Sequence, residues 1–184
     1  LNAFAVADVS TLSAATLAAY DVVVLAKMPL TADQVTTLSN WVDTGGNLIA
    51  MAPDAQLAGL LGITPTGTAL SNGYLLVDTS ARPGNGIVGQ TIQYHGVADR
   101  YTLSGARALA TLYSAAATAT GNPAVTLRSA GAGQAAAFAY DLATSIVYTR
   151  QGNPAWAAQE RDGVAPIRSD DKFYGNKVGD TQPD

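Results

Sequence analysis

The sequence has no cysteine, one histidine and one glutamate in 184 residues. The absence of cysteine excludes disulfides, thiolate catalysis and cysteine-based metal sites. A single histidine, His95, excludes a His-x-x-x-His zinc motif and any site that needs two imidazoles. These absences remove several common catalytic and metal-binding chemistries before any motif is considered.

Charge and long apolar runs are also scarce. Charged residues make up 13% of the chain, about half the usual quarter of soluble domains. Ten Lys and Arg against fourteen Asp and Glu give a net charge of −4, which argues against a nucleic-acid surface. No apolar run reaches the roughly 18 residues of a membrane-spanning helix, so no membrane span is predicted. With 48% hydrophobic residues, the composition excludes overall disorder and predicts one folded domain, alone or with a tail.

Alanine, threonine, glycine and serine take the place of charged residues on the expected surface, a composition common in secreted bacterial modules. The chain begins with Leu1 rather than an initiator methionine, and no charged and apolar leader follows it. We therefore interpret the chain as a piece of a longer protein, and we expect that protein to be extracellular or part of the cell envelope.

The clearest local pattern is a strand–helix–strand unit. Residues 21–26 contain a β-branched run typical of a strand buried on both faces of a parallel sheet. Thr31 and Gln34 have the spacing of a capping box, and the helix that they begin ends at Gly45-Gly46. A second apolar strand follows at 48–52. Two buried strands joined by a capped amphipathic helix predict a βαβ crossover.

The remaining elements are shorter. A strand is predicted at 3–8, a helix at 14–20 with Ser13 as its N-cap, and a short helix from Asp54 to Leu61. Turn residues then separate a series of predicted strands: 73–78, 91–97, 107–113, 123–129 and 134–140.

The last two of these strands predict an antiparallel hairpin near a sheet edge, with Gly131-Ala132-Gly133 as its turn. A final helix is predicted at 142–150. From Gly152 onward the chain is polar and rich in Pro, Asp and Asn. The sequence thus predicts a folded domain over residues 1–151 and an extended polar tail over 152–184.

Two segments carry a resemblance to a known family. The sequence Gly-Gly-Asn-Leu-Ile-Ala-Met-Ala at 45–52, with the capped helix before it, is similar to a segment of the class I glutamine amidotransferase-like superfamily. Residues 122–142, in which a Gly-x-Gly turn leads into a strand ending in an aromatic residue and Asp, resemble the late hairpin of its non-glutaminase relatives, such as the trimerisation domain of some β-galactosidases. Residues 148–154 resemble those relatives as well.

The resemblance implies an α/β fold, a three-layer flavodoxin-like sandwich. Its sheet would be mostly parallel, with the antiparallel hairpin at the edge. Related sheets begin with one more strand–helix unit than this chain has before residues 3–8, so we expect that unit to be missing.

The same resemblance implies that the glutaminase site is absent. Active members place a cysteine on the sharp turn after the strand at 47–52, where this sequence has Ala50-Met51-Ala52-Pro53-Asp54. They place a general-base histidine after the strand that ends here at Tyr140, where this sequence has Asp141. We therefore expect a bend shaped like a reactive elbow that carries no nucleophile, and no catalytic residue is predicted.

Three side chains remain as candidates for a ligand site: Asp54, His95 and Asp141. The position of Asp54 at the start of a helix favours an N-cap, although ligands often bind at this edge of an α/β sheet. His95 is either a polar residue on an irregular strand or part of a small cluster with its sequence neighbours: Asp99, Arg100 and Tyr101. The aspartates at 162 and 170–171 lack the spacing of a calcium loop, and no metal or cofactor is predicted.

The prediction from sequence is a non-catalytic structural or interaction domain of a larger, secreted bacterial protein related to carbohydrate. Its expected partners are other domains of the same polypeptide or further copies of the chain. One alternative is a hydrolase that gathers Asp54, Asp141 and His95 within about 4–6 Å of a shared cleft. Another is a carbohydrate- or small-molecule-binding module with exposed Tyr or Trp faces.

Overall fold

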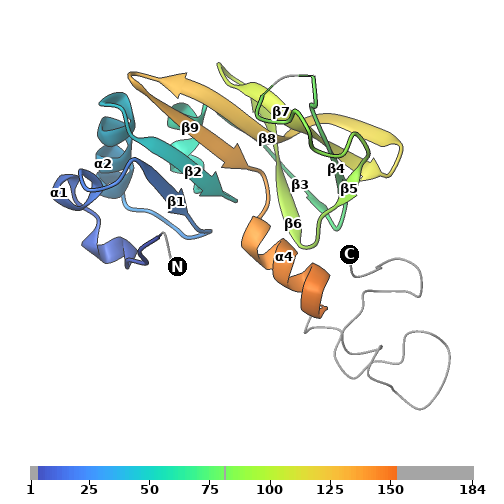
Figure 1. Cartoon of the computed structure of the whole chain (residues 1–184), viewed down its shortest axis with the longest axis horizontal. Helices are drawn as coiled ribbons and strands as arrows, with labels where there is room; N and C mark the ends of the chain where they lie inside the picture. Colours follow the sequence, from blue (N-terminus) through green and yellow to red (C-terminus); the bar gives the residue numbers. More distant parts are fainter. Residues whose placement is uncertain (1–3, 81, 153–184) are drawn as a thin grey trace, which may run out of the picture.

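A computed structural model of the chain describes residues 4–80 and 82–152 (Figure 1). Strands dominate this part of the chain, and the helices are short. The strands are β1 (Val22–Leu25), β2 (Asn47–Met51), β3 (Ile63–Ser71), β4 (Tyr74–Val77), β5 (Ile92–Gln93), β6 (Val97–Leu103), β7 (Arg107–Ala115), β8 (Thr118–Ala130) and β9 (Gly133–Phe138). The helices are the 3-10 turns η1 (Val9–Thr11) and η2 (Ala55–Leu57), and α1 (Ala14–Leu17), α2 (Ala32–Asp43), α3 (Ala58–Leu61) and α4 (Leu142–Gln151). Within the described ranges, no helix has both the length and the apolar character needed to cross a membrane.

Seven strands form one mixed sheet in the order β1-β2-β9-β8-β7-β4-β5, and β3 pairs with β6 in a second, two-stranded sheet. β1, β2 and β9 run parallel to one another. Every pairing from β9 through β8, β7 and β4 to β5 is antiparallel. Figure 1 shows the sheet curling from β1 toward β5, with α4 projecting from the end of β9. We refer to β1, β2 and β9 as the parallel part and to β9, β8, β7, β4 and β5 as the antiparallel part, so that β9 belongs to both.

The predicted flavodoxin-like sandwich with a mostly parallel sheet is wrong. Parallel pairing of consecutive strands needs a crossover long enough to hold a helix, whereas after Gly62 the strands follow one another mostly through turns and short loops. Such connections favour antiparallel pairing. The predicted hairpin exists as β8 and β9, but it lies in the middle of the sheet because β9 also pairs in parallel with β2.

The strand–helix–strand unit was predicted correctly. In α2, the Thr31 hydroxyl accepts from the backbone N–H of Gln34, and the Gln34 side chain accepts from the backbone N–H of Thr31. This reciprocal cap satisfies two of the donors that a helix start leaves without partners. The buried side of α2, including Trp41, belongs to one core with Leu48 and Ala50 of β2.

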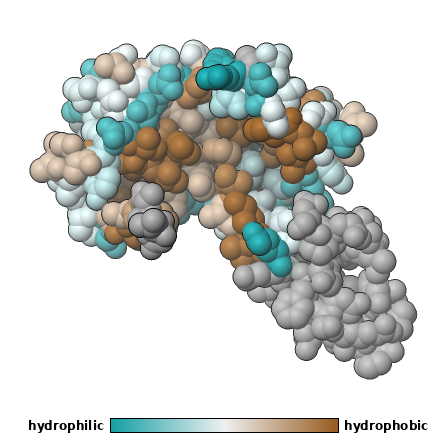
Figure 2. Space-filling view, viewed as in Figure 1, coloured by the Kyte–Doolittle hydropathy of each residue, from teal (hydrophilic) through white to brown (hydrophobic). Residues whose placement is uncertain are grey.

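The expectation that β1 is buried on both faces is wrong. Leu25 is buried, but Val22 and Val24 are 51% and 58% exposed. In the parallel register Val24 stands beside Ile49, and Met51 follows on the same face because side chains alternate along a strand. Figure 2 shows hydrophobic residues gathered over β1 and β2 on this face. We call Val22, Val24, Ile49 and Met51 the open face.

The antiparallel part is built around aromatic residues. The rings of Tyr94 and Tyr140 stack with centroids 4.9 Å apart, and Phe138 meets Tyr140 edge to face at 6.0 Å. The Tyr94 hydroxyl donates to the carbonyl of Leu70 on β3 at 2.7 Å. These contacts connect the second sheet to the end of β9, where α4 begins.

The predictions for the two ends of the chain have different outcomes. Residues 4–8 form no strand, so the strand predicted at 3–8 is wrong where it is described. Ser13 caps α1 as expected, although the helix ends at Leu17. The final helix is confirmed as α4. The predicted tail begins at Gly152 and otherwise lies outside the described residues.

Candidate functional site

The bend after β2 has the shape that the sequence predicted. The strand ends at Met51, and Ala52 adopts a positive φ of 42°, a conformation rarely adopted by residues other than glycine. Its backbone N–H donates to the carbonyl of Phe138 at 2.9 Å, which ties the bend to β9. A corner from a strand to a helical turn is therefore present, although not in the mostly parallel sheet that was expected around it. The Ala52 side chain at this corner is a buried methyl group.

Asp54 acts as the helix cap that follows this corner. Its carboxylate accepts from the backbone N–H of Gln56 at 2.9 Å and from the backbone N–H of Leu30 at 3.0 Å. These two hydrogen bonds, the one from Gln56 first, lower the pKa of Asp54 because they stabilise its charged form. The Gln56 side chain also donates to the carbonyl of Leu30. Asp54 thus fixes the loop before α2 against the corner after β2.

Asp141 caps the next helix along this edge of the sheet. It follows β9 as Asp54 follows β2, and its carboxylate accepts from the backbone N–H of Thr144 at 3.2 Å and from its hydroxyl at 2.6 Å. The parallel pairing of Met51 with Phe138 brings the two strand ends to the same edge. Both aspartates therefore serve the start of a helix or helical turn.

His95 is buried in the loop between β5 and β6. Its backbone N–H donates to the Ser145 hydroxyl at 3.0 Å, so the loop holds the first turn of α4. Burial lowers the pKa of His95, which favours the neutral imidazole. Its sequence neighbour Asp99 donates its backbone N–H to Ala139, and burial, with a smaller contribution from the Asp99 carboxylate, raises the pKa of Tyr101.

The three candidate residues do not form a hydrogen-bonded group. Within residues 4–80 and 82–152, no hydrogen bond joins the side chains of Asp54, His95 and Asp141. The same part of the chain contains no cluster of three or more His, Asp or Glu side chains arranged to hold a metal ion. Each candidate instead holds a loop or a helix in place.

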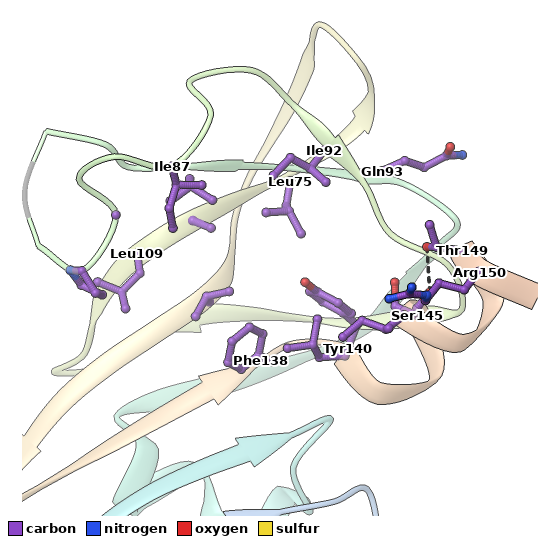
Figure 3. A pocket seen from close by; sticks show the side chains of 17 residues that line it. Leu75, Ile87, Ile92, Gln93, Leu109, Phe138, Tyr140, Ser145, Thr149 and Arg150 are labelled. Atoms are coloured by element: carbon purple, nitrogen blue, oxygen red, sulfur yellow. Dashed lines mark hydrogen bonds between the residues drawn. The ribbon is translucent and has the colours of Figure 1, made fainter. Parts of the chain in front are cut away.

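A cavity that the sequence did not reveal lies between the antiparallel part of the sheet and α4 (Figure 3). Its volume is about 570 Å³. Leu75 and Ile92 form one wall, Phe138 and Tyr140 lie across from them, and α4 closes one end (Figure 3). None of the three candidate residues lines it. Its lining comes from five strands (β4, β5, β7, β8 and β9), from the loop between β4 and β5, and from α4. These segments are distant in sequence, so no local motif could have indicated the cavity.

The end of the cavity next to α4 is polar. Tyr140, Ser145 and Arg150 come together there (Figure 3). Tyr140 is 4% exposed, and burial raises its pKa to about 12. No hydrogen bond within the described residues involves its hydroxyl, whereas the Tyr94 hydroxyl donates to the carbonyl of Leu70.

Comparisons with known proteins support the fold. No protein-family model matches the chain, and no curated protein matches it. The chain resembles a solved β-galactosidase from Bacillus circulans sp. alkalophilus, with 16% identity and a TM-score of 0.56, over 67% of this chain and 20% of that one. It also resembles the exo-β-1,4-mannosidase Op5Man5 from Opitutaceae bacterium strain TAV5, with 20% identity and a TM-score of 0.54, over 71% and 22%. The cytoplasmic protein STM3548 from Salmonella typhimurium matches with 14% identity and a TM-score of 0.55, over 72% and 66%.

The chain spans only about a fifth of the length of the β-galactosidase and the mannosidase. At these identities the likeness is one of fold. It agrees with the part of the expected resemblance that named domains of β-galactosidases. The glutamine amidotransferase-like assignment is corrected, because the described chain is β-rich and no family model supports that superfamily.

Proposed function

We propose that this chain is a non-catalytic interaction domain of a larger, carbohydrate-related protein, and that its open face packs against another domain of the same polypeptide. The open face carries this proposal. Val22 and Val24 are about half exposed on a strand whose other face holds the partly buried Val23 and the buried Leu25. Exposed apolar patches of this kind mark interaction surfaces.

Two further observations support the proposal. The structurally similar β-galactosidase and mannosidase are about five times longer than the matched region, which favours a partner within one polypeptide over a second copy of the chain. The polar candidate residues are engaged in capping and loop contacts: Asp54 and Asp141 accept backbone N–H groups. These roles account for them without a catalytic function.

We also propose that the parent protein is exported from the cell. The low charged content of 13%, with Ala, Thr, Gly and Ser in place of charged residues, supports this location. Its proposed relation to carbohydrate rests on the likeness of fold to the β-galactosidase and the mannosidase.

Hydrogen–deuterium exchange tests the interaction directly. The exchange of β1 and β2 amides is measured in this chain alone and in the full-length protein. We expect slower exchange in the full-length protein and loss of that protection in the double variant Val22→Thr/Val24→Thr, since threonine keeps the β-branched shape and removes apolar surface. Val97→Thr, at a 50% exposed position of β6, is the matched control and retains the protection.

Two results would overturn the proposal. If the β1 and β2 amides exchanged equally fast in this chain alone and in the full-length protein, the open face would be uncovered in both. If the isolated chain instead forms an oligomer by light scattering and already protects β1, the partner is a second copy rather than another domain.

A further inference from the structure

The cavity beside α4 has the size and lining of a small-molecule site. Its volume of about 570 Å³ falls within the roughly 300–1,000 Å³ of ligand pockets. Leu75, Ile92 and Leu109 supply apolar walls from β4, β5 and β7, and Phe138 adds an aromatic surface from β9. None of its lining residues belongs to β1 or β2, so the cavity is distinct from the open face.

The polar groups of the cavity are gathered at one end and include donors without acceptors. The Tyr140 hydroxyl makes no hydrogen bond within the described part of the chain, and Tyr140 lines the cavity although its side chain is only 4% exposed. The Ser145 oxygen accepts the backbone N–H of His95, so its own proton is available to a ligand. Because burial raises the pKa of Tyr140 to about 12, the phenol stays protonated at neutral pH and remains a donor.

Among the described residues, one cation and no acidic side chain line the cavity. Arg150 is the only charged residue among the described lining residues, and it stands in the last turn of α4. A guanidinium beside hydroxyl donors favours a carboxylate, since both kinds of donor bind an anionic oxygen. The apolar walls favour a hydrocarbon body attached to it.

We propose that this cavity binds an amphiphilic monocarboxylate, with its hydrocarbon body against Leu75, Ile92 and Phe138 and its carboxylate toward Tyr140 and Arg150. A ligand oxygen beside the Tyr140 hydroxyl accepts a hydrogen bond from it, which adds to the affinity. The distribution of groups therefore sets the orientation of the ligand as well as its charge.

Calorimetric titration of the intact chain with octanoate tests the proposal. We expect saturable binding of octanoate, weaker binding of octan-1-ol, and none of acetate. Arg150→Gln should weaken octanoate binding about tenfold and leave octan-1-ol unchanged, because only the carboxylate needs the cation. Tyr140→Phe should weaken both ligands several-fold. Arg107→Gln, an exposed arginine outside the cavity, is the matched control and leaves both affinities unchanged.

The site of binding is located independently with methyl NMR and a variant that fills the cavity. Octanoate should shift the methyl resonances of Leu75 and Ile92, and Ile92→Trp should abolish binding while the circular dichroism spectrum stays native. The absence of saturable binding would overturn the proposal. It would also be overturned if Ile92→Trp left binding intact or if the shifts fell on Val22 and Val24, since octanoate would then be adsorbing to the open face. The double variant Val22→Thr/Val24→Thr should leave octanoate binding unchanged, which separates this test from that of the proposed interaction.

Discussion

The parallel and antiparallel parts of the sheet share β9 but pack in opposite ways. In the parallel part, Ala135 and Ala137 of β9 are small and buried, so α2 and α3 can lie close to the sheet. In the antiparallel part, Phe138 at the end of β9 and Tyr140 beyond it are large, and they form the floor of a cavity. One short strand thus changes from helix packing to cavity lining within a few residues.

The difference shows where each part leaves apolar surface. The parallel part covers one face with helices and leaves Val22 and Val24 exposed on the other. The antiparallel part directs its apolar side chains into a concave space between β4, β5 and α4. The first surface is an exposed face of the sheet, which suits the proposed contact with another domain, whereas the second is a cavity, which suits the proposed small-molecule ligand.

The largest expected effect on stability comes from core substitutions, which test whether the two parts unfold together. Leu48 in β2 and Leu112 in β7 are both almost fully buried, at 1% and 0% exposed. Replacing either with alanine should lower the free energy of unfolding by about 3 kcal/mol, through lost burial and the cavity left behind. Urea unfolding followed by far-UV circular dichroism measures both variants.

A cooperative sheet predicts one transition in each variant, with an unchanged slope. Trp41 fluorescence, in a Trp156→Phe background, reports the parallel part separately. If Leu112→Ala shifted the circular dichroism transition while the Trp41 transition stayed in place, the two parts would be independent folding units, and the shared strand β9 would not couple them.

The second test concerns the close approach of β9 to the end of α2. A Cβ atom added at Gly133 would overlap the backbone carbonyl oxygens of Gly46 and Val42, which cannot move aside as a flexible side chain can. Gly133→Ala should therefore destabilise the protein by about 2 kcal/mol. Gly59→Ala is the matched control, because nothing lies within 4 Å of its added Cβ and alanine favours a helix. Its free energy of unfolding should stay unchanged or rise slightly.

The parallel part was also the part that sequence predicted best. The capping box at Thr31 and Gln34 and the β-branched run of β1 are local signals, and local signals determine where a helix or a strand lies. They do not say what covers the opposite face of a strand. For that reason the positions of β1 and α2 were predicted correctly, while the predicted burial of Val22 and Val24 was wrong.

The antiparallel part shows the limit of local signals more strongly. No strand was predicted where β3 lies. Pro65 and Gly67 are unfavourable in a strand interior, and β3 contains them because its pairing with β6 shifts register between Pro65 and Ala69. The position of the hairpin was wrong because strand order depends on pairing between β2 and β9, about ninety residues apart in the chain. Among the candidate site residues, the N-cap role of Asp54 was predicted from its position at the start of a helix. The cavity could not be predicted from the sequence, because its lining residues are distant in the chain.

The third test compares the two stacked tyrosines of the antiparallel part. The Tyr94 hydroxyl donates to Leu70 at 2.7 Å, so Tyr94→Phe leaves a carbonyl without its partner and should cost about 1 kcal/mol. Tyr140→Phe removes a hydroxyl that has no partner among the described residues and should leave stability nearly unchanged or slightly higher. Thermal unfolding of the two variants, side by side, measures the difference. Equal losses would mean that the Tyr140 hydroxyl is bonded in the free protein and would weaken the case for it as a ligand donor.

The smallest effect concerns His95, which lies where the antiparallel part meets α4. In the folded protein, burial lowers the pKa of His95 below its ordinary value of 6.5. The unfolded chain therefore binds a proton more readily than the folded protein does. The contribution of neutral His95 to stability is complete above pH 6.5 and is lost as the pH falls from there toward the lower folded-state pKa. Because His95 is the only histidine, His95→Gln should flatten the dependence of unfolding free energy on pH between about 7.5 and 5.5. If the unfolding free energy of His95→Gln depended on pH as steeply as that of the unmodified protein, another group would titrate in this range. The loop that holds α4 would then not be the acid-sensitive contact.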